Sequence, residues 1–338
     1  MSFLNVIRRR LMFLILVLFG VTVITFTISN LIPGDPARMI AGDRATPEIV
    51  QNIREDLGLD KPLPIQYLRY LEGVVQGDFG NSIRTRRPVL EDLRIFFPAT
   101  LELALTALFF ATALGIPLGV ASAVWKDKPI DHFVRVIAVT GISTPAFWLG
   151  LLVILLFYGN LGWLPSGGRI DPSLEMPTRV TGFLMIDSLL AGDLTAFGSA
   201  LKHILLPAFT LGFVHLGVVA RQVRAAMLEE LQQDYIRTAK ANGLSRFKVV
   251  FTEALPNAMI PSITVLGLAL GDLLYGAVLT ETVFAWPGMG AYVVNSIQAL
   301  DFPAVMGFTV VVSLAYVLIN LAVDLIYMAV DPRIREVS

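Results

Sequence analysis

Residues 234–256 read DYIRTAKANGLSRFKVVFTEALP, a basic segment set between long apolar stretches of the chain. The residues that lead into it, from 221 to 241, are good helix formers, and Asn242-Gly243 matches a helix end at which glycine takes the left-handed conformation. Ser245 is placed to cap a second helix, which Pro256 is expected to bend or end. The segment, which we call the elbow, therefore predicts two helices that meet at an angle at Gly243.

Two interpretations of the elbow follow from its residues alone. In the first, two basic helices that meet at an angle and project from the membrane act as a rigid lever on which a cytoplasmic partner pushes. The alternative is a solvated connector whose basic side chains meet anionic lipid. The elbow by itself leaves both open.

The composition of the whole chain indicates an integral membrane protein. Of its 338 residues, 55% are hydrophobic and 16% are charged, with a formal net charge of −1. This balance argues against a soluble enzyme and against a nucleic-acid partner. The chain has no cysteine, which excludes disulfides and thiolate chemistry, and its three scattered histidines argue against a histidine metal site.

Six apolar runs are long enough to cross about 30 Å of hydrocarbon. The fourth is the shortest and contains Pro207 and His215, residues that a buried span tolerates. The predicted fold is all-α, a polytopic membrane protein with six transmembrane helices. The expected spans are 11–32, 99–125, 136–158, 203–220, 260–284 and 304–330.

The distribution of lysine and arginine predicts the orientation of these spans. Both short connections that carry basic residues, 126–135 and 221–248, are expected inside, whereas 287–303 has no Lys or Arg and is expected outside. The first span follows Arg8, Arg9 and Arg10, but its length and the lack of a small-residue cleavage site favour a retained helix over a signal peptide. We expect a multi-pass protein of the plasma membrane with both termini in the cytoplasm.

The spans divide the chain into three parts. Residues 1–32 hold the N-terminus and first span, 33–98 form an extracytoplasmic segment, and 99–338 form a core of five spans. That core contains an outer insertion, 159–202, and a cytoplasmic connection, 221–257. Short helices are expected over 47–58 and 64–75 from their capping residues and apolar spacing. They rest on the bilayer interface or dock an extracellular partner.

A few polar residues inside the predicted spans are candidates for a substrate path. Asp272 lies in mid-span, where a charge must meet water or a partner, so it either lines the path or bonds another span. Glu281 and Thr282, like Glu102, lie near the outer end of a span and belong either to an external gate or to the solvated interface. Pro145 predicts a kink in the third span.

The elbow resembles the cytoplasmic loop of binding-protein-dependent ABC importer permeases, whose pattern is Glu-Ala-Ala, three residues, Gly, nine residues, Ile, one residue, Leu-Pro. The matching positions here are Arg237-Thr238-Ala239, Gly243, Glu253 and Leu255-Pro256, so the first two residues and the Ile position depart from the pattern. The local form DYIRTAKANGL is similar to the peptide-transporter branch.

Other segments resemble the dipeptide and oligopeptide permease family along nearly the whole chain. They are LIPGDPA at 31–37, EDLGLDKP at 55–62, GDFGNS at 77–82, PATLEL at 98–103, TGFLMIDSLLAGD at 181–193, LTETVFAWPGMG at 279–290 and VDPRIR at 330–335. Members of this family also carry glutathione, nickel chelates or oligosaccharides. The resemblance implies the type I ABC importer permease fold in a prokaryotic inner membrane.

The resemblance also implies a division of labour. The chain would pair with a homologous second permease, two ATP-binding subunits and an extracytoplasmic substrate-binding protein, and the ATP-binding subunits would hold ATP and Mg. No G-x-x-x-x-G-K-[ST] phosphate loop occurs in the sequence, so the chain is expected to be neither an ATPase nor another enzyme, with no cofactor or metal of its own. The residues implied in coupling to an ATP-binding subunit are Tyr235, Ile236, Arg237, Thr238, Ala239, Gly243, Leu255 and Pro256.

Two other function classes compete with this interpretation. A secondary transporter or channel often shows internal repeats with broken helices in matching positions, and the sequence shows no convincing repeat. A membrane-embedded enzyme would require paired acids, a nucleophile with a base, or a metal constellation within the spans. The favoured function is the transmembrane subunit of an importer for dipeptides or other short peptides.

Overall fold

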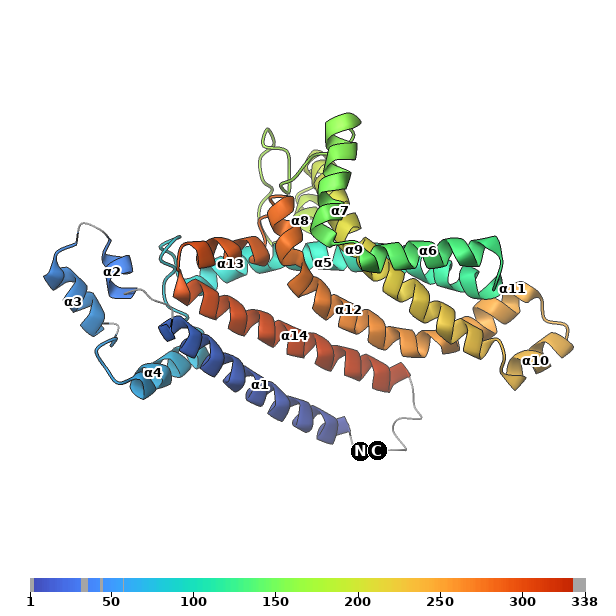
Figure 1. Cartoon of the computed structure of the whole chain (residues 1–338), viewed down its shortest axis with the longest axis horizontal. Helices are drawn as coiled ribbons and strands as arrows, with labels where there is room; N and C mark the ends of the chain where they lie inside the picture. Colours follow the sequence, from blue (N-terminus) through green and yellow to red (C-terminus); the bar gives the residue numbers. More distant parts are fainter. Residues whose placement is uncertain (1–2, 32–35, 43–44, 57, 331–338) are drawn as a thin grey trace. The chain divides into compact units, whose positions relative to one another are not determined.

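The computed structural model describes the chain except for residues 1–2, 32–35, 43–44, 57 and 331–338. Parts of three resembling segments, 31–37, 55–62 and 330–335, and the C-terminus expected in the cytoplasm lie outside the described residues. The described part is helical almost throughout, and its isolated β-bridge joins Asn81 to Pro88 (Figure 1). The expected all-α class is confirmed.

The chain divides into two compact units, and each is treated separately. The smaller unit is Leu4–Phe97 with Tyr292–Val317, and the larger is Met1–Phe3, Pro98–Ala291 and Leu318–Ser338. Four helices have residues in both units: α1 (Phe3–Leu31), α5 (Val89–Val124), α13 (Met289–Gln298) and α14 (Phe302–Val330). The smaller unit holds α1 (Phe3–Leu31), α2 (Pro36–Ala41), α3 (Pro47–Asp56), α4 (Leu63–Gln76), most of α13 (Met289–Gln298) and the first half of α14 (Phe302–Val330).

The larger unit holds the rest of the helices, in chain order α5 (Val89–Val124), α6 (Pro129–Ser143), α7 (Ala146–Val153), the π-helical segment η1 (Ile154–Asn160), α8 (Leu184–Leu190), α9 (Leu194–Glu230), α10 (Asp234–Ala241), α11 (Arg246–Lys248), the π-helical segment η2 (Val249–Ala254) and α12 (Leu255–Val283).

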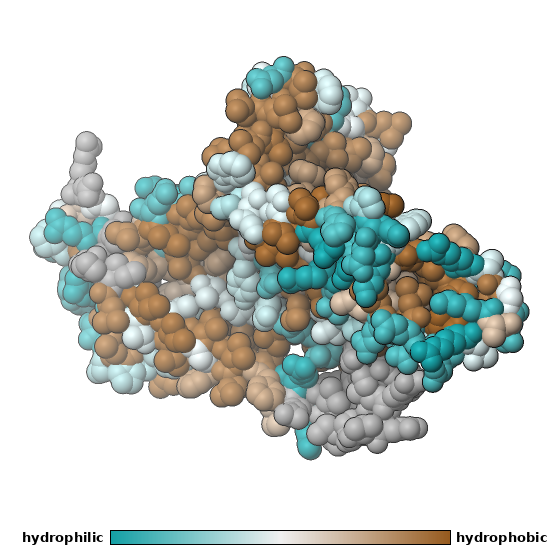
Figure 2. All heavy atoms as spheres, turned by 45° about the vertical axis from the view of Figure 1, so that its right-hand side comes forward, coloured by the Kyte–Doolittle hydropathy of each residue, from teal (hydrophilic) through white to brown (hydrophobic). Residues whose placement is uncertain are grey.

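Among the described residues, five helical stretches are long and apolar enough to cross a membrane. They are Met12–Leu31, Val89–Val124, Leu194–Glu230, Arg246–Val283 and Phe302–Ile326. Each corresponds to one of the six expected spans. Figure 2 shows hydrophobic side chains covering much of the visible face, as expected of helices whose outer sides meet lipid.

Three of these stretches start well before the predicted residue, namely those of the second, the fourth and the fifth expected span. For the second and the fourth, residues at the helix start account for the difference. The second span starts at Val89 and not at 99, because Glu91 and Asp92 in the first turn favour a helix N-terminus despite their charge. The fourth starts at Leu194 and not at 203, because the Asp193 side chain accepts hydrogen bonds from the amides of Thr195 and Ala196.

The third expected span is a broken one. Helix α6 ends at Ser143 and α7 begins at Ala146, and the two apolar halves are bent by 106°. The kink expected at Pro145 is thus confirmed in place, although it is a complete break. Because proline has no N–H and disfavours a helical residue before it, α6 stops there and Pro145 opens α7 instead. Counted as one span, the pair completes six.

Helix α9 is the central helix of the larger unit. In the most apolar part of α9, 67% of the residues are buried, whereas the share is 39% in α5 and 39% in the stretch from α11 to α12. A Cβ added at Gly119 of α5 would lie 2.7 Å from the Ala220 carbonyl oxygen, and one at Gly212 of α9 would lie 2.7 Å from that of Ala107. Backbone therefore meets backbone between α5 and α9, as small residues permit in membrane proteins.

In the smaller unit, the residues that follow α13 pack against the N-terminal half of the chain. The buried Asp301 carboxylate accepts hydrogen bonds from Ser82 Oγ (2.5 Å) and the Arg84 amide (3.1 Å). Tyr292 stacks on Phe96 with ring centroids 5.0 Å apart. Residues 292–317 thus group with 4–97, a division that differs from the expected core of 99–338.

The two short helices expected over 47–58 and 64–75 are confirmed as α3 and α4. Gly58 and Gly77 follow them with φ of +67° and +77°, so both helices end at a left-handed glycine.

We expect Gly119→Ala to lower the melting temperature of the purified protein. The added methyl would press on Ala220 and Val223, and such overpacking costs about 1–3 kcal/mol. Gly198→Ala in α9 is the matched control, because nothing lies within 4 Å of its added Cβ. That change should hold or raise stability, since alanine favours helix. Equal melting temperatures for the two variants, measured by tryptophan fluorescence, would contradict the close packing of α5 on α9.

Candidate functional site

The elbow has the expected left-handed turn. After α10, Gly243 has a φ of +79°, and the Leu244 amide donates to the Ala239 carbonyl (3.2 Å). Nothing lies within 4 Å of a Cβ added at Gly243, so the demand for glycine comes from the backbone conformation alone. The Ser245 side chain caps the next helix by accepting from the Lys248 amide. The predicted pair of helices joined at Gly243 is confirmed.

Helix α10 is held by one buried side chain. Ile236 is fully buried in a cluster with Val223, Met227 and Val250, which belong to α9 and η2. By contrast, the Arg237 side chain is 75% exposed, and Tyr235 is 39% exposed. Thr238 is exposed and Ala239 is half-buried. Most side chains of α10 are therefore exposed on the surface of the chain.

Tyr235 connects the three helices that meet at the elbow. Its hydroxyl donates to the Glu230 carboxylate at the end of α9 (2.5 Å) and accepts from Asn257 Nδ2 in the first turn of α12 (3.1 Å). Partial burial, together with the neighbouring Glu230 carboxylate, raises the pKa of Tyr235 above its usual value. The tyrosine stays protonated near neutral pH, so this donor is permanent.

The helix does not end at Pro256, which corrects that part of the prediction. Helical structure runs without interruption from Arg246 to Val283, and Pro256 lies in the first turn of α12. The π-helical segment η2 comes immediately before it, and such a widened turn accommodates a residue that cannot donate an N–H. Leu255 is half-buried against the cluster around Ile236, and Pro256 is exposed.

A cavity of about 370 Å³ opens beside the elbow. Its walls are mostly apolar, with two cations, and are formed by Val124, Leu231, Lys240, Leu244, Arg246, Val249 and Val250. Arg246 Nη2 donates to the Val124 carbonyl at the end of α5 (3.1 Å), which holds α11 against α5.

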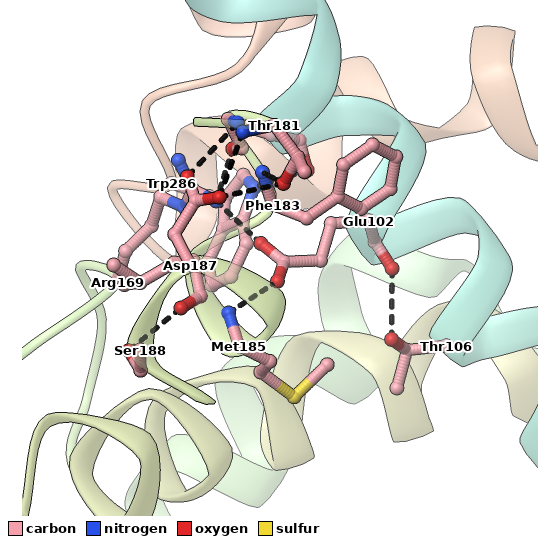
Figure 3. Close-up of polar contacts among 12 residues, drawn as sticks. Glu102, Thr106, Arg169, Thr181, Phe183, Met185, Asp187, Ser188 and Trp286 are labelled. Atoms are coloured by element: carbon pink, nitrogen blue, oxygen red, sulfur yellow. Dashed lines mark hydrogen bonds and ion pairs between the residues drawn. The ribbon is translucent and has the colours of Figure 1, made fainter. Parts of the chain in front are cut away.

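A second polar site ties the 159–202 insertion to α5 (Figure 3). The Arg169 guanidinium donates to the Glu102 carboxylate and to the Gly182 carbonyl, and it lies over the Trp286 ring, 5.4 Å from the ring centroid. The other Glu102 oxygen accepts from the Met185 amide (2.8 Å). Glu102 is 3% exposed, so the interfacial solvation considered for it is wrong; it forms a buried ion pair.

Asp187 of α8 forms hydrogen bonds within the same insertion. Its carboxylate accepts from the Thr181 amide and hydroxyl, both at 2.7 Å, and from the Gly182 amide (2.9 Å). Burial alone would raise the pKa of Asp187, but these donors outweigh it and hold the pKa below the usual value. The insertion is thus a folded element with its own charged centre.

Glu281 is not available to line a substrate path, which corrects that prediction. It is fully buried, and its carboxylate accepts from Thr100 Oγ1 (2.5 Å) and from the Ala291 amide (3.0 Å). Nearby, Trp286 Nε1 donates to the Ala99 carbonyl (3.0 Å). The end of α12 and the turn after it are therefore bonded to Ala99 and Thr100 of α5.

The other two path candidates remain at a surface of the single chain. Asp272 is exposed in the middle of α12, near enough to His215 of α9 for their charges to interact. Thr282 is exposed, with its hydroxyl donating to the Val278 carbonyl (2.9 Å). Asp272 is not brought together with Glu281 or Thr282 into one site. Across the described residues, no group of three or more His, Cys, Asp or Glu is placed to hold a metal ion.

We expect Arg169→Gln to loosen the 159–202 insertion. The change leaves Glu102 buried without its cation, and breaking a buried pair in this way costs about 3–5 kcal/mol. Hydrogen exchange at the α8 amides should accelerate relative to wild type. Lys202→Gln, at an exposed site in α9, is the control and should leave the exchange unchanged. Identical exchange in all three proteins would show that the ion pair does not hold the insertion.

Comparison with known proteins supports the family expected from the elbow. Residues 115–336 match the model of the binding-protein-dependent transport system inner membrane component, and residues 3–104 match that of its N-terminal part. A chain of the MetNI methionine ABC transporter in an inward-facing conformation has 19% sequence identity and a TM-score of 0.50, with 69% of this chain and 93% of that chain covered. That similarity bears on the fold alone and supports the type I importer permease fold.

Curated relatives match this chain from end to end. The probable D,D-dipeptide transport system permease protein of Escherichia coli (strain K12) is 67% identical, covering 99% of this chain and 98% of that protein. The di/tripeptide transport system permease protein of Pseudomonas aeruginosa (strain UCBPP-PA14) is 45% identical, covering 98% and 99%. The glutathione transport system permease protein of Salmonella paratyphi A (strain ATCC 9150 / SARB42) is 40% identical, covering 98% and 99%. The chain therefore belongs to the family of binding-protein-dependent transport system inner membrane components, and it is a multi-pass membrane protein.

Proposed function

We propose that the chain is a transmembrane subunit of an ATP-driven importer of dipeptides, and that D,D-dipeptides are the first substrates to test. The observation that carries the proposal is the 67% identity, over nearly the whole of both chains, with a D,D-dipeptide permease. Glutathione stays the main alternative solute, because a glutathione permease is 40% identical over a similar length. A nickel chelate or an oligosaccharide is a weaker alternative, which rests only on the resemblance of the sequence to the wider family.

The importer would need partners that supply its energy and its substrate. A homologous second permease would complete the path, two ATP-binding subunits would bind ATP and Mg, and an extracytoplasmic binding protein would deliver the peptide. The sequence of this chain contains no phosphate-binding loop, which agrees with energy supplied by other subunits of the complex. ATP can drive the permease only if the ATP-binding subunits bind its two states with different affinity.

The elbow is the surface proposed to receive an ATP-binding subunit. Tyr235, Arg237 and Thr238 are exposed on α10, whereas Ile236 anchors the helix. A push on α10 passes to α9 and α12 through the two hydrogen bonds of Tyr235. The cavity beside it offers an apolar lining with Lys240 and Arg246 at which a partner side chain can insert.

The proposed orientation places the elbow in the cytoplasm. Hydrophilic side chains gather on the end of the larger unit that carries α10 and α11 (Figure 2). Basic residues accumulate in such short cytoplasmic connections. With the elbow inside, the alternation of spans would put both termini on the cytoplasmic side and the 159–202 insertion on the outer side, where a binding protein would arrive.

Asp272 is proposed to face the path for the peptide. A carboxylate exposed in mid-span cannot face lipid without a cost of roughly 2.5–3.5 kcal/mol or more. In a water-filled path it can pair with the ammonium group of a peptide. Thr282 is proposed as a neutral residue of the same path; Glu281, being buried, is not.

We expect Gly243→Ala to reduce ATP-driven uptake by about fivefold or more. A side chain at a left-handed position costs about 1 kcal/mol or more, which biases the elbow away from this conformation. Gly192→Ala is the matched control, because Gly192 also has a positive φ, +70°, and open space around it, but follows α8. Uptake and ATP hydrolysis would be measured on the reconstituted complex. An equal loss of ATP-driven uptake in both variants would show that backbone strain in general, and not a change at the elbow, reduces uptake.

The partners and substrate are tested by purifying the chain from its native membrane in mild detergent. We expect a second permease, ATP-binding subunits and a binding protein to co-purify, and that binding protein to bind D-alanyl-D-alanine more tightly than glutathione. Recovery of the chain alone, with uptake after reconstitution that needs no ATP, would contradict the proposal and indicate a secondary transporter.

A further inference from the structure

The buried carboxylate of Asp131 joins three parts of the larger unit. It has no exposed surface and accepts two parallel hydrogen bonds from Arg224 of α9, from Nε to Oδ1 (2.7 Å) and from Nη2 to Oδ2 (2.9 Å). Ser122 Oγ of α5 donates to Oδ1 (2.5 Å), and the Asp127 amide donates to Oδ2 (2.9 Å). Arg135 lies farther out, 3.6 Å from the carboxylate.

The position of this pair relates it to the elbow. Arg224 lies six residues before the end of α9 at Glu230, which is about 9 Å along the helix axis at 1.5 Å per residue. Asp131 lies in the first turn of α6. The pair therefore joins α6 to the part of α9 that leads directly into α10.

Glycines hold the rest of α6 against α9. A Cβ at Gly217 would lie 2.5 Å from the Ala138 carbonyl oxygen, and one at Gly141 would lie 2.7 Å from that of Phe213. Such contacts hold the two helices close, but they make few directional bonds. The fork of two hydrogen bonds from Arg224 fixes rotation and register at the end of α6 nearest the elbow.

Fold stability does not account for a buried ion pair at this place. The Asp131 carboxylate is fully buried and the Arg224 side chain is 21% exposed. Because burying a charge offsets much of the attraction, such a pair is weak evidence for a role in stability. What an ion pair adds is one defined geometry. Because the glycine contacts already pack α6 on α9, that geometry points to a role in transmitting movement.

We infer that Asp131 and Arg224 are positioning residues that make α6 follow α9 when the elbow moves. A displacement of α10 reaches α9 directly and passes to α6 through the ion pair, so that the first half of the broken span moves with the central helix. The inference rests on the proposed function, because it takes the elbow as the place where ATP-driven movement enters the chain.

The test compares the reconstituted complex with Asp131→Asn and with Arg224→Lys. We expect both variants to assemble and hydrolyse ATP, and the uptake per ATP hydrolysed to fall by about fivefold or more, the lower range of typical coupling effects. Arg221→Gln, at an exposed arginine of α9, is the control and should keep the wild-type ratio. Wild-type ratios in both pair variants would overturn the inference. Absence of ATP-driven uptake in the wild type would instead overturn the proposed function.

A second measurement covers variants that fail to assemble. The chain has no cysteine, so spin labels can be placed at Val136→Cys in α6 and Glu229→Cys in α9, both exposed positions. In the otherwise unchanged complex, the distance between the labels should be the same without nucleotide and with ATP trapped. A shift of that distance between the two states would show that α6 does not follow α9.

Discussion

Close backbone contact around α9 is the constraint on which the larger unit depends. Lipid tails are as apolar as leucine, so burial of apolar surface does little to bring transmembrane helices together. Helices instead approach where a side chain is missing, as at Gly119 and Gly212 between α5 and α9 and at Gly217 between α6 and α9. Three helices packed this closely leave few alternative arrangements, and the elbow extends directly from the central one.

Charged groups are used sparingly in this unit, and each buried one has partners of fixed geometry. Glu102 meets Arg169, Asp131 meets Arg224, and Glu281 meets the Thr100 hydroxyl and a backbone amide. An unsatisfied polar group in hydrocarbon costs several kcal/mol, so these contacts have to form together with the packing around them. Asp131 and Glu281 lie near helix ends, whereas Glu102 lies inside α5 and joins that helix to the 159–202 insertion.

The sequence predicted the features that depend on local chemistry. The apolar spans follow from length and composition, the left-handed turn at Gly243 from its position after a helix, and the kink at Pro145, which the structure shows as a complete break, from its missing N–H. The buried ion pairs were not predicted, because their partners lie far apart in the chain: 67 residues separate Arg169 from Glu102, and 93 separate Arg224 from Asp131. Nothing local in a single sequence marks such a pairing. The prediction that Glu281 lines a substrate path was wrong for the same reason, since its buried carboxylate bonds to Thr100, 181 residues away.

The bend between α6 and α7 has a consequence for how the protein enters the membrane. Helix α6 has 15 residues, which reach about 22 Å at 1.5 Å per residue, short of the roughly 30 Å of hydrocarbon. Neither half of the broken span is therefore a sufficient signal for independent insertion as a straight helix. Since α6 packs against α9, which follows it in the chain, the two halves can reach their final positions only after α9 has been synthesised. Biogenesis of this region is thus ordered by the chain itself, with the central helix as the template for the span that precedes it.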